Sequence, residues 1–151
     1  MTTLTNTAIN TPGNAASSND VKRGLLLLAH GARDPAWALP FEAVARRIRA
    51  TDDSLLVSLA FLEFMQPAVV AAGHALAEAG CTHIDLVPLF LGAGGHVRKD
   101  LPVFLAELQS GHPRILWRMQ PAIGEVPSVI DAMADATLAL LNSSSTPASR
   151  T

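Results

Sequence analysis

Four short apolar runs alternate along this chain with segments that show helical periodicity. The runs are residues 24–29, 55–62, 83–88 and 114–119. Runs of this length, nearly continuous in Leu, Val, Ile and Ala, are typical of strands buried on both faces. The helical segments are expected at residues 35–50, 67–79, 100–109 and 125–141. This alternation predicts an α/β domain with a four-stranded parallel sheet and right-handed crossovers.

Several residues mark where the helices begin and end. Asp34 is the expected N-cap of the first helix, with Pro35 at its first position, and Pro40 predicts an irregular first turn. Gly80 is expected just after the second helix as its C′ residue. The apolar spacing predicts a buried face of the first helix made of Leu39, Val44 and Ile48.

The usual doubly wound strand order, 2-1-3-4, puts the first and third strands side by side, with helices on both faces of the sheet. The carboxyl ends of these two strands then flank the switch point where open α/β sheets bind ligands. We expect one domain over residues 21–141. Residues 1–20 and 142–151 are rich in Ser, Thr, Asn and Ala, and we expect a disordered leader and a disordered tail there.

Two histidines follow the strands that meet at this edge. His30 comes directly after the first run, and His96 follows Gly92, Gly94 and Gly95 in the segment after the third run. An imidazole at such an edge can bind a divalent metal or accept a proton. Two imidazoles form an incomplete ligand set, which suits a metal held transiently better than a structural zinc. The alternative is two loop histidines without a chemical role.

Other polar residues lie around the same edge in the predicted fold. Glu63 ends the second strand and is a candidate third ligand or proton acceptor; a solvent-facing or capping role is the alternative. Arg33, Arg98 and Lys99 suit a polycarboxylate ligand, because arginine can hold a carboxylate by two hydrogen bonds. The alternative partners of these cations are Asp34 and Asp100. For the other histidines we expect structural roles; these are His74, His83 and His112.

Composition excludes several classes of function. A net charge of -2 leaves no large positive excess for binding nucleic acid or an anionic membrane. No apolar run approaches the roughly 20 residues of a membrane span. A single cysteine, Cys81, permits neither an intrachain disulfide nor a multi-cysteine metal site, so we expect a cytoplasmic protein.

Three segments together resemble one known family. They read L-L-L-L-A-H-G-A-R-D-P, V-S-L-A-F-L-E-F-M-Q-P and V-P-L-F-L-G-A-G-G-H-V-R-K-D-L-P. In order and spacing they are similar to the short-form class II chelatases, the CbiX-type sirohydrochlorin chelatases. The resemblance implies half of a two-lobed chelatase fold. It also implies insertion of Co²⁺ or Fe²⁺ into sirohydrochlorin for cobalamin or sirohaem synthesis, with no permanently bound cofactor.

The resemblance also implies roles for individual residues. His30 and His96 would bind the metal and help remove the pyrrole protons, and Glu63 would be an auxiliary metal or proton group. Expected substrate-binding residues are Gly31, Ala32, Arg33, Gly94, Gly95 and Arg98. Ala32 stands where the family motif often has serine, so a hydroxyl contact to the substrate is lost, although backbone N–H groups remain. Long relatives hold two such units in tandem, which implies a homodimer here.

Two other functions fit part of the pattern. A histidine phosphatase also uses a strand-end His-Gly, but its histidine follows an arginine, and Ala29 precedes His30 here. A protein that only stores or delivers a divalent metal is the second alternative. The physiological metal stays open, because cobalt, iron and nickel all accept imidazole ligands.

Overall fold

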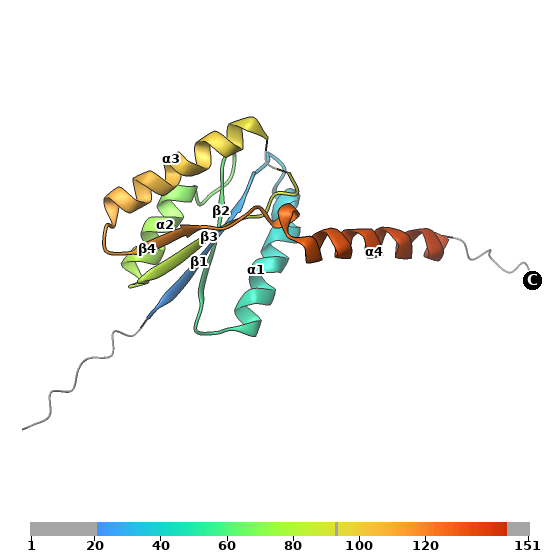
Figure 1. Ribbon diagram of the computed structural model, residues 1–151, viewed down its shortest axis with the longest axis horizontal. Helices are drawn as coiled ribbons and strands as arrows, with labels where there is room; N and C mark the ends of the chain where they lie inside the picture. Colours follow the sequence, from blue (N-terminus) through green and yellow to red (C-terminus); the bar gives the residue numbers. More distant parts are fainter. Residues whose placement is uncertain (1–20, 93, 145–151) are drawn as a thin grey trace, which may run out of the picture.

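The computed structural model describes residues 21–92 and 94–144, without the side chains of His96 and Ser144. The predicted leader, residues 1–20, and residues 145–151 of the predicted tail lie outside the described residues. Within the described ranges, four strands form one parallel sheet in the order β2-β1-β3-β4, which confirms the predicted order (Figure 1). The strands are β1 (Arg23–Ala29), β2 (Leu56–Phe61), β3 (His83–Pro88) and β4 (Leu116–Met119).

The strand register brings three carboxyl ends to one edge of the sheet. Ala29, the last residue of β1, pairs with Phe61, the last residue of β2. Leu28 of β1 pairs with Pro88, the last residue of β3. The loops after β1, β2 and β3 therefore leave the sheet side by side, as the sequence predicts.

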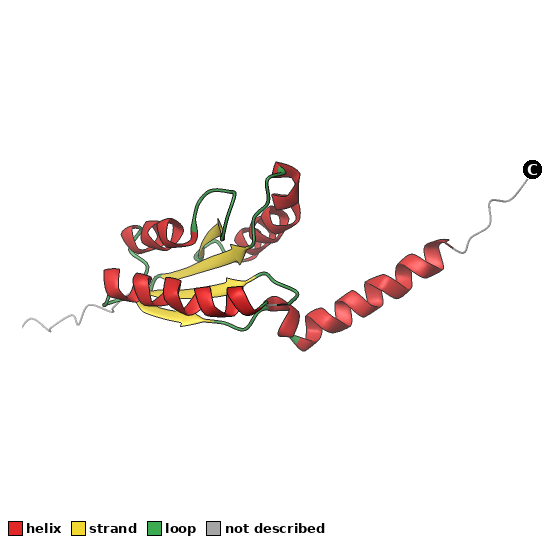
Figure 2. Cartoon of the chain, turned by 90° about the horizontal axis from the view of Figure 1, so that it is seen from above, coloured by secondary structure: helices red, strands yellow, loops and turns green. Residues whose placement is uncertain are grey.

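Helices connect and cover the strands. They are the 3-10 turn η1 (Pro35–Ala38), α1 (Leu39–Thr51), α2 (Val69–Glu78), α3 (Gly95–Gly111), the 3-10 turn η2 (Ile123–Glu125) and α4 (Pro127–Ser144). Figure 1 shows α1 on one side of the sheet and α2 and α3 on the other. Helix α4 projects away from the body (Figure 2). Over the part of the chain that the structure describes, no helix is both long and apolar enough to cross a membrane.

The predicted helix ends are confirmed in part. Asp34 is the N-cap, and its side chain accepts a hydrogen bond from Ala36 N at 2.9 Å. The first turn is a 3-10 turn, and the regular helix begins only at Leu39, in agreement with the irregularity expected at Pro40. After α2, Gly80 adopts a φ of 89° and donates its N–H to Ala77 O, so it is the C′ residue.

Helix α3 begins at Gly95, although the sequence predicts a start at Asp100. Glycine has a low helix propensity, so Gly94 and Gly95 weigh against a helix in any sequence-based prediction. At the N-cap, however, glycine is well tolerated, and Gly94 O accepts the hydrogen bond from Arg98 N at 3.1 Å. His96 consequently lies in the first turn of α3 and not in the loop before it.

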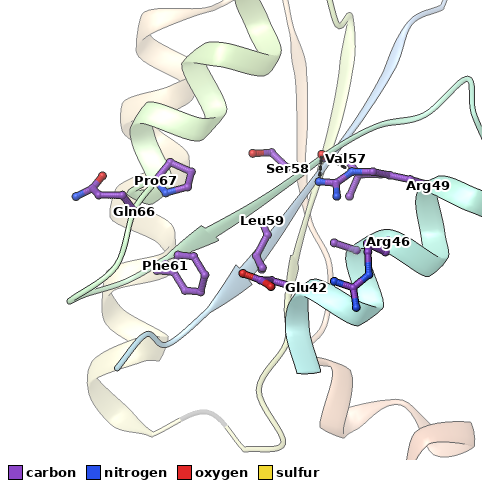
Figure 3. Close-up of a pocket in the computed structure, with 10 residues that line it drawn as sticks. Glu42, Arg46, Arg49, Val57, Ser58, Leu59, Phe61, Gln66 and Pro67 are labelled. Atoms are coloured by element: carbon purple, nitrogen blue, oxygen red, sulfur yellow. Dashed lines mark hydrogen bonds between the residues drawn. The ribbon is translucent and has the colours of Figure 1, made fainter. Parts of the chain in front are cut away.

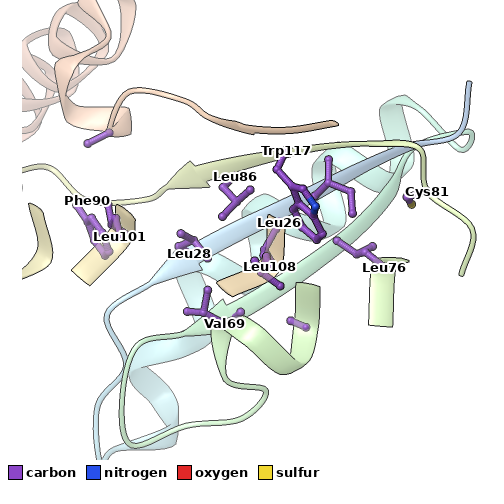
Figure 4. Packing of buried hydrophobic residues seen from close by; sticks show 14 residues of the cluster. Leu26, Leu28, Val69, Leu76, Cys81, Leu86, Phe90, Leu101, Leu108 and Trp117 are labelled. Carbon is purple, nitrogen blue, oxygen red and sulfur yellow. The ribbon is translucent and has the colours of Figure 1, made fainter. Parts of the chain in front are cut away.

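The main core lies between the sheet and the helices α2 and α3 (Figure 4). Alternate residues of β1 and β3 face these helices, as expected for strands with a period of two. Gly73 of α2 lets the two helices approach closely, because a side chain there would overlap fully buried Leu108 of α3. The strand residues of this core are Leu26, Leu28, Ile84 and Leu86, and the helix residues include Val69, Leu76, Leu101 and Leu108.

The opposite face of the sheet is only partly covered, and the predicted buried face of α1 is wrong. Ala45 is buried, but Leu39 is 59% exposed and Val44 is 41% exposed, while Ile48 is partly buried. The apolar spacing of α1 predicts a packed face, but no neighbouring helix covers this side of α1 in the described structure. Helix α4, the remaining candidate for that role, extends away from the sheet (Figure 1).

The single cysteine gives a prediction about reactivity. Cys81 is buried against Gly24, and this burial raises the pKa of its thiol, while the nearby charge of Lys22 acts in the opposite direction. Because the thiolate is the reactive form, native Cys81 should react with a thiol reagent such as DTNB far more slowly than the unfolded chain at pH 8. Equal rates for native and guanidinium-unfolded protein would contradict this prediction.

Candidate active site

Backbone hydrogen bonds beyond the ends of β1 and β2 bring His30 and Glu63 together. Leu62 N donates to Ala29 O at 3.0 Å, and Glu63 N donates to His30 O at 3.1 Å. The parallel pairing thus continues for two residues after the strands end. Gly31 makes this close approach possible: its φ is 95°, and a side chain there would overlap the backbone oxygen of Glu63.

The side chains of this pair form a direct polar contact. His30 Nε2 lies 3.1 Å from Glu63 Oε1, and the two side chains are 51% and 49% exposed. Half-exposed groups of this kind interact with each other and are still accessible to a ligand. An exposed ion pair contributes only about 0 to 1 kcal/mol to stability, so its effect on folding is small. The contact with Glu63 orients the imidazole of His30.

The loop after β3 reaches the same place. Leu89 N donates to Leu28 O at 2.8 Å, which keeps this loop beside β1 for one residue beyond the strand. Phe90 is buried, and its ring meets the His30 ring edge to face with centroids 6.3 Å apart. Phe90 was not predicted as part of the site, and the signal that could have indicated it is its position two residues after the third strand. The apolar ring restricts one side of the imidazole, so ligands must approach from another side.

The structure leaves the second proposed ligand open. The backbone of His96 lies in the first turn of α3, but its side chain lies outside the described residues. A shared metal site of His30 and His96 therefore stays a prediction. Among the side chains that are described, no group of three or more His, Cys, Asp or Glu is close enough to hold a metal ion.

The two arginines have partners other than those considered from the sequence. The Arg33 guanidinium lies 5.3 Å from the ring centroid of Phe64, an exposed residue with a φ of 62°. Arg98 Nη2 lies 3.7 Å from Glu125 Oε1, a residue of η2 that sequence analysis did not single out. Both arginines are exposed, and a carboxylate ligand can reach them.

The glycines and Ala32 differ in how accessible they are. Gly31 is buried and Ala32 is partly buried, whereas Gly94 and Gly95 are exposed at the start of α3. Nothing lies within 4 Å of the position that a side chain at Gly94 or Gly95 would take. The N–H groups of a helix start in such an open position suit an anionic group. Binding of substrate by any of these four residues stays a prediction.

The remaining histidines lie elsewhere. His74 of α2 and His112, the C-cap residue of α3, approach each other with Nδ1 and Nε2 2.7 Å apart. His83 begins β3, at the amino end of the strand, and its Nδ1 lies 3.0 Å from Thr82 Oγ1. These contacts are local, and neither the pair nor His83 is at the carboxyl edge where His30 lies.

A separate hollow of about 460 Å³ lies between α1 and the edge strand β2 (Figure 3). Arg49 donates to Val57 O through Nη2 at 2.7 Å and through Nε at 3.3 Å. The guanidinium thereby satisfies a carbonyl of the strand edge, which protects that edge from pairing with another strand. His30 and Glu63 do not line this hollow.

The chain is similar in sequence to curated chelatases. The chain is 36% identical over 86 residues to a sirohydrochlorin cobaltochelatase of Sulfurisphaera tokodaii, covering 57% of this chain and 70% of that protein. It is 26% identical over 113 residues to a sirohydrochlorin ferrochelatase of Bacillus subtilis, covering 75% of this chain and 43% of that protein. The matched part of the chain therefore covers less than half the length of the B. subtilis enzyme.

A solved structure shows the same fold over most of the chain. The crystal structure of a putative cobalamin biosynthesis CbiX protein from Marinobacter aquaeolei superposes with a TM-score of 0.70 and 29% identity. It covers 80% of this chain and 98% of that one. The family model described as CbiX matches residues 24–139, which include His30, Glu63 and His96. The chain belongs to the CbiX family.

Proposed function

We propose that this protein is a sirohydrochlorin chelatase that inserts Co²⁺ or Fe²⁺ into the tetrapyrrole, for cobalamin or sirohaem synthesis. The observation that carries the proposal is the contact of His30 Nε2 with Glu63 Oε1 at 3.1 Å on an open sheet edge. The names of the relatives from S. tokodaii and B. subtilis support sirohydrochlorin as the substrate and cobalt or iron as the metal. No permanently bound cofactor is part of the proposal.

The reaction needs a base and an accessible metal ligand. Insertion of a divalent ion replaces two pyrrole N–H protons, so the metallated product forms together with two released protons. When Nε2–H of His30 donates to Glu63 Oε1, the lone pair of Nδ1 is left to bind the incoming ion or to accept a proton. Glu63 holds the imidazole in this orientation and is itself the acceptor of the proton that leaves His30. His96 is the second proposed ligand and base.

The substrate's rim of carboxylates needs cationic partners. Arg33 and Arg98 are the proposed ones, together with the N–H groups at Gly94 and Gly95, and those near Gly31 and Ala32. The contact of Arg98 with Glu125 is long and exposed on both sides, so a substrate carboxylate can displace it at little cost.

We further propose a cytoplasmic location, because the single cysteine is free and buried. We also propose a homodimer, because the chain matches less than half of a longer relative.

The experiment that tests the function is a metallation assay. Purified protein is mixed with sirohydrochlorin and Co²⁺, or with Fe²⁺ under anaerobic conditions, and the absorbance of the tetrapyrrole is followed against a protein-free control. Insertion faster than the control supports the chelatase. Metal binding without faster insertion would instead identify a storage or delivery protein. Neither of these two results is expected of a histidine phosphatase.

The cationic rim gives a separate prediction. Arg33→Ala and Arg98→Ala should each raise KM for sirohydrochlorin about tenfold or more, because a charge-assisted hydrogen bond contributes about 1.5 to 3 kcal/mol. Since the arginines do not touch the reacting nitrogens, kcat should change little. Arg114→Ala is the matched control, because Arg114 is exposed just before β4, at the amino end of the strands. An unchanged KM in both variants would show that other groups bind the carboxylates.

A further inference from the structure

Phe64 is an aromatic residue that the fold keeps outside its core. All Phe and Trp residues of the chain lie within the described ranges, and Phe64 alone among them is exposed, at 60%. An aromatic side chain stabilises a domain chiefly by burying its large apolar area, and the Phe64 ring contributes little in this way. A single exposed apolar side chain is common, so only its backbone and its neighbours can assign it a role.

The backbone at Phe64 adopts a conformation that bulky residues avoid. Its φ is 62°, and Met65 N donates to Glu63 O at 2.8 Å across it. A hydrogen bond between residues two apart around a positive φ is the pattern of the rare and strained form of the γ-turn. Glycine or asparagine would hold this turn with less strain. Phenylalanine therefore destabilises the turn without packing into the core, and strained residues of this kind cluster where proteins hold ligands.

This turn lies directly beside the proposed reacting groups. It begins at Glu63, whose Oε1 lies 3.1 Å from His30 Nε2. The Glu63 oxygen that accepts the bond from Met65 N is also the atom that a side chain at Gly31 would overlap. The loop after β1 therefore packs against the turn. The Phe64 ring is thus exposed at the carboxyl edge, next to the half-exposed pair, and not on a remote surface.

A positive charge lies beside the ring. The Arg33 guanidinium is 5.3 Å from the Phe64 ring centroid, a distance at which a cation and an aromatic face attract each other. Arg33 follows β1 and Phe64 follows β2, so the contact joins the two loops. Both residues are exposed, so the contact adds little to stability, but it sets a cation next to an apolar ring. A flat apolar ligand with carboxylates at its rim has the matching chemistry.

We propose that the macrocycle of sirohydrochlorin stacks on Phe64, with a carboxylate of its rim bound to Arg33. Offset stacking of flat rings is favourable beyond the area that it buries, so one aromatic side chain can hold the plane of the macrocycle. Stacking there sets that plane beside His30, which is where the pyrrole nitrogens must lie to lose their protons. This inference rests on the proposed function and names the residue that orients its substrate.

The test measures anaerobic binding of metal-free sirohydrochlorin, by the absorbance of the tetrapyrrole, and urea-induced unfolding at a fixed protein concentration. Phe64→Asn removes the ring and places in the turn a residue that tolerates a positive φ. Its Kd should rise about tenfold or more, while its urea midpoint stays at or above that of the wild type. Phe64→Tyr keeps the ring, so its Kd should stay within about threefold of the wild-type value.

Leu116→Ala is the control for the loss of an exposed apolar side chain. Leu116 is 48% exposed and begins β4, at the amino end of the strands. This substitution removes apolar surface far from the carboxyl edge, so the Kd for sirohydrochlorin should not change.

The remaining outcomes separate the stacking from the function. A wild-type protein that does not bind sirohydrochlorin would contradict the proposed function, and the stacking with it. If the wild type binds and metallates sirohydrochlorin and Phe64→Asn binds it equally well, the function stands and the stacking is wrong. Weaker binding of Phe64→Asn together with a lower urea midpoint would identify a structural residue and overturn the inference. A Phe64→Tyr protein that binds as weakly as Phe64→Asn would also overturn it, because stacking requires only the ring.

Discussion

Replacing His30 with alanine should reduce enzyme-dependent metal insertion nearly to the protein-free rate while the fold remains intact. The imidazole is half exposed at the end of β1, and its main polar contact is with the equally exposed Glu63. Loss of an exposed pair costs about 0 to 1 kcal/mol of stability, so unfolding cannot account for a large loss of rate. The measurement is the initial rate of sirohydrochlorin metallation as a function of metal concentration, with thermal unfolding measured on the same sample.

The variants around His30 show which role each group has. Glu63→Gln keeps a hydrogen-bonding side chain but removes the negative charge, so it should retain more activity than His30→Ala. His96→Ala should lose activity as His30→Ala does, and the double variant should be hardly worse than either single one. This non-additivity is expected for residues that act as one unit.

His74→Ala is the control for the histidines. It removes the 2.7 Å contact with His112 and has no direct effect on the carboxyl edge, so the rate should stay near that of the wild type. A His30→Ala enzyme with the wild-type rate and an unaltered metal dependence would remove His30 from the mechanism. In that case Glu63 and His96 would have to be tested as a site without it.

The strand order and the position of the site follow from patterns that the sequence displays directly. Apolar runs of strand length alternate with helical segments, and this alone predicts the parallel sheet and its carboxyl edge. The residues that end strands were therefore identified correctly as neighbours: His30 and Glu63 do meet. In this parallel pair both strands end at the same level of the sheet. Each apolar run is followed directly by a polar residue, His30 in one case and Glu63 in the other.

The helix boundaries and the arginine partners could not be predicted in the same way. Gly94 and Gly95 suggest a loop by propensity, but glycine is well tolerated at the N-cap, so α3 begins at Gly95 and His96 lies in a helix. The partner of Arg98 is Glu125, 27 positions along the chain, and no periodicity connects the two. The expected buried face of α1 failed for a further reason. Its apolar spacing indicates a covering element, but the spacing does not show whether that element belongs to the same chain.

Replacing Gly31 with alanine should destabilise the domain by about 2 to 4 kcal/mol, a large effect for one methyl group. Two costs add at this position. An alanine at a φ of 95° is strained, and its Cβ would overlap the backbone oxygen of Glu63, which cannot turn aside as a flexible side chain can. The loop after β1 must then move away from Glu63, and the hydrogen bond from Glu63 N to His30 O is lost. The same movement separates His30 from Glu63, so metal insertion should fall as well.

The measurement is urea-induced unfolding at a fixed protein concentration, because any dimer makes the apparent stability depend on concentration. Gly92→Ala is the matched control: it adds the same methyl group to an exposed loop where nothing lies within 4 Å, and its φ is outside the left-handed region. It should change the free energy of unfolding by less than about 0.5 kcal/mol. A Gly31→Ala protein as stable as Gly92→Ala would show that the two loops need not approach closely. His30 and Glu63 would then be brought together by their side chains and not by the backbone.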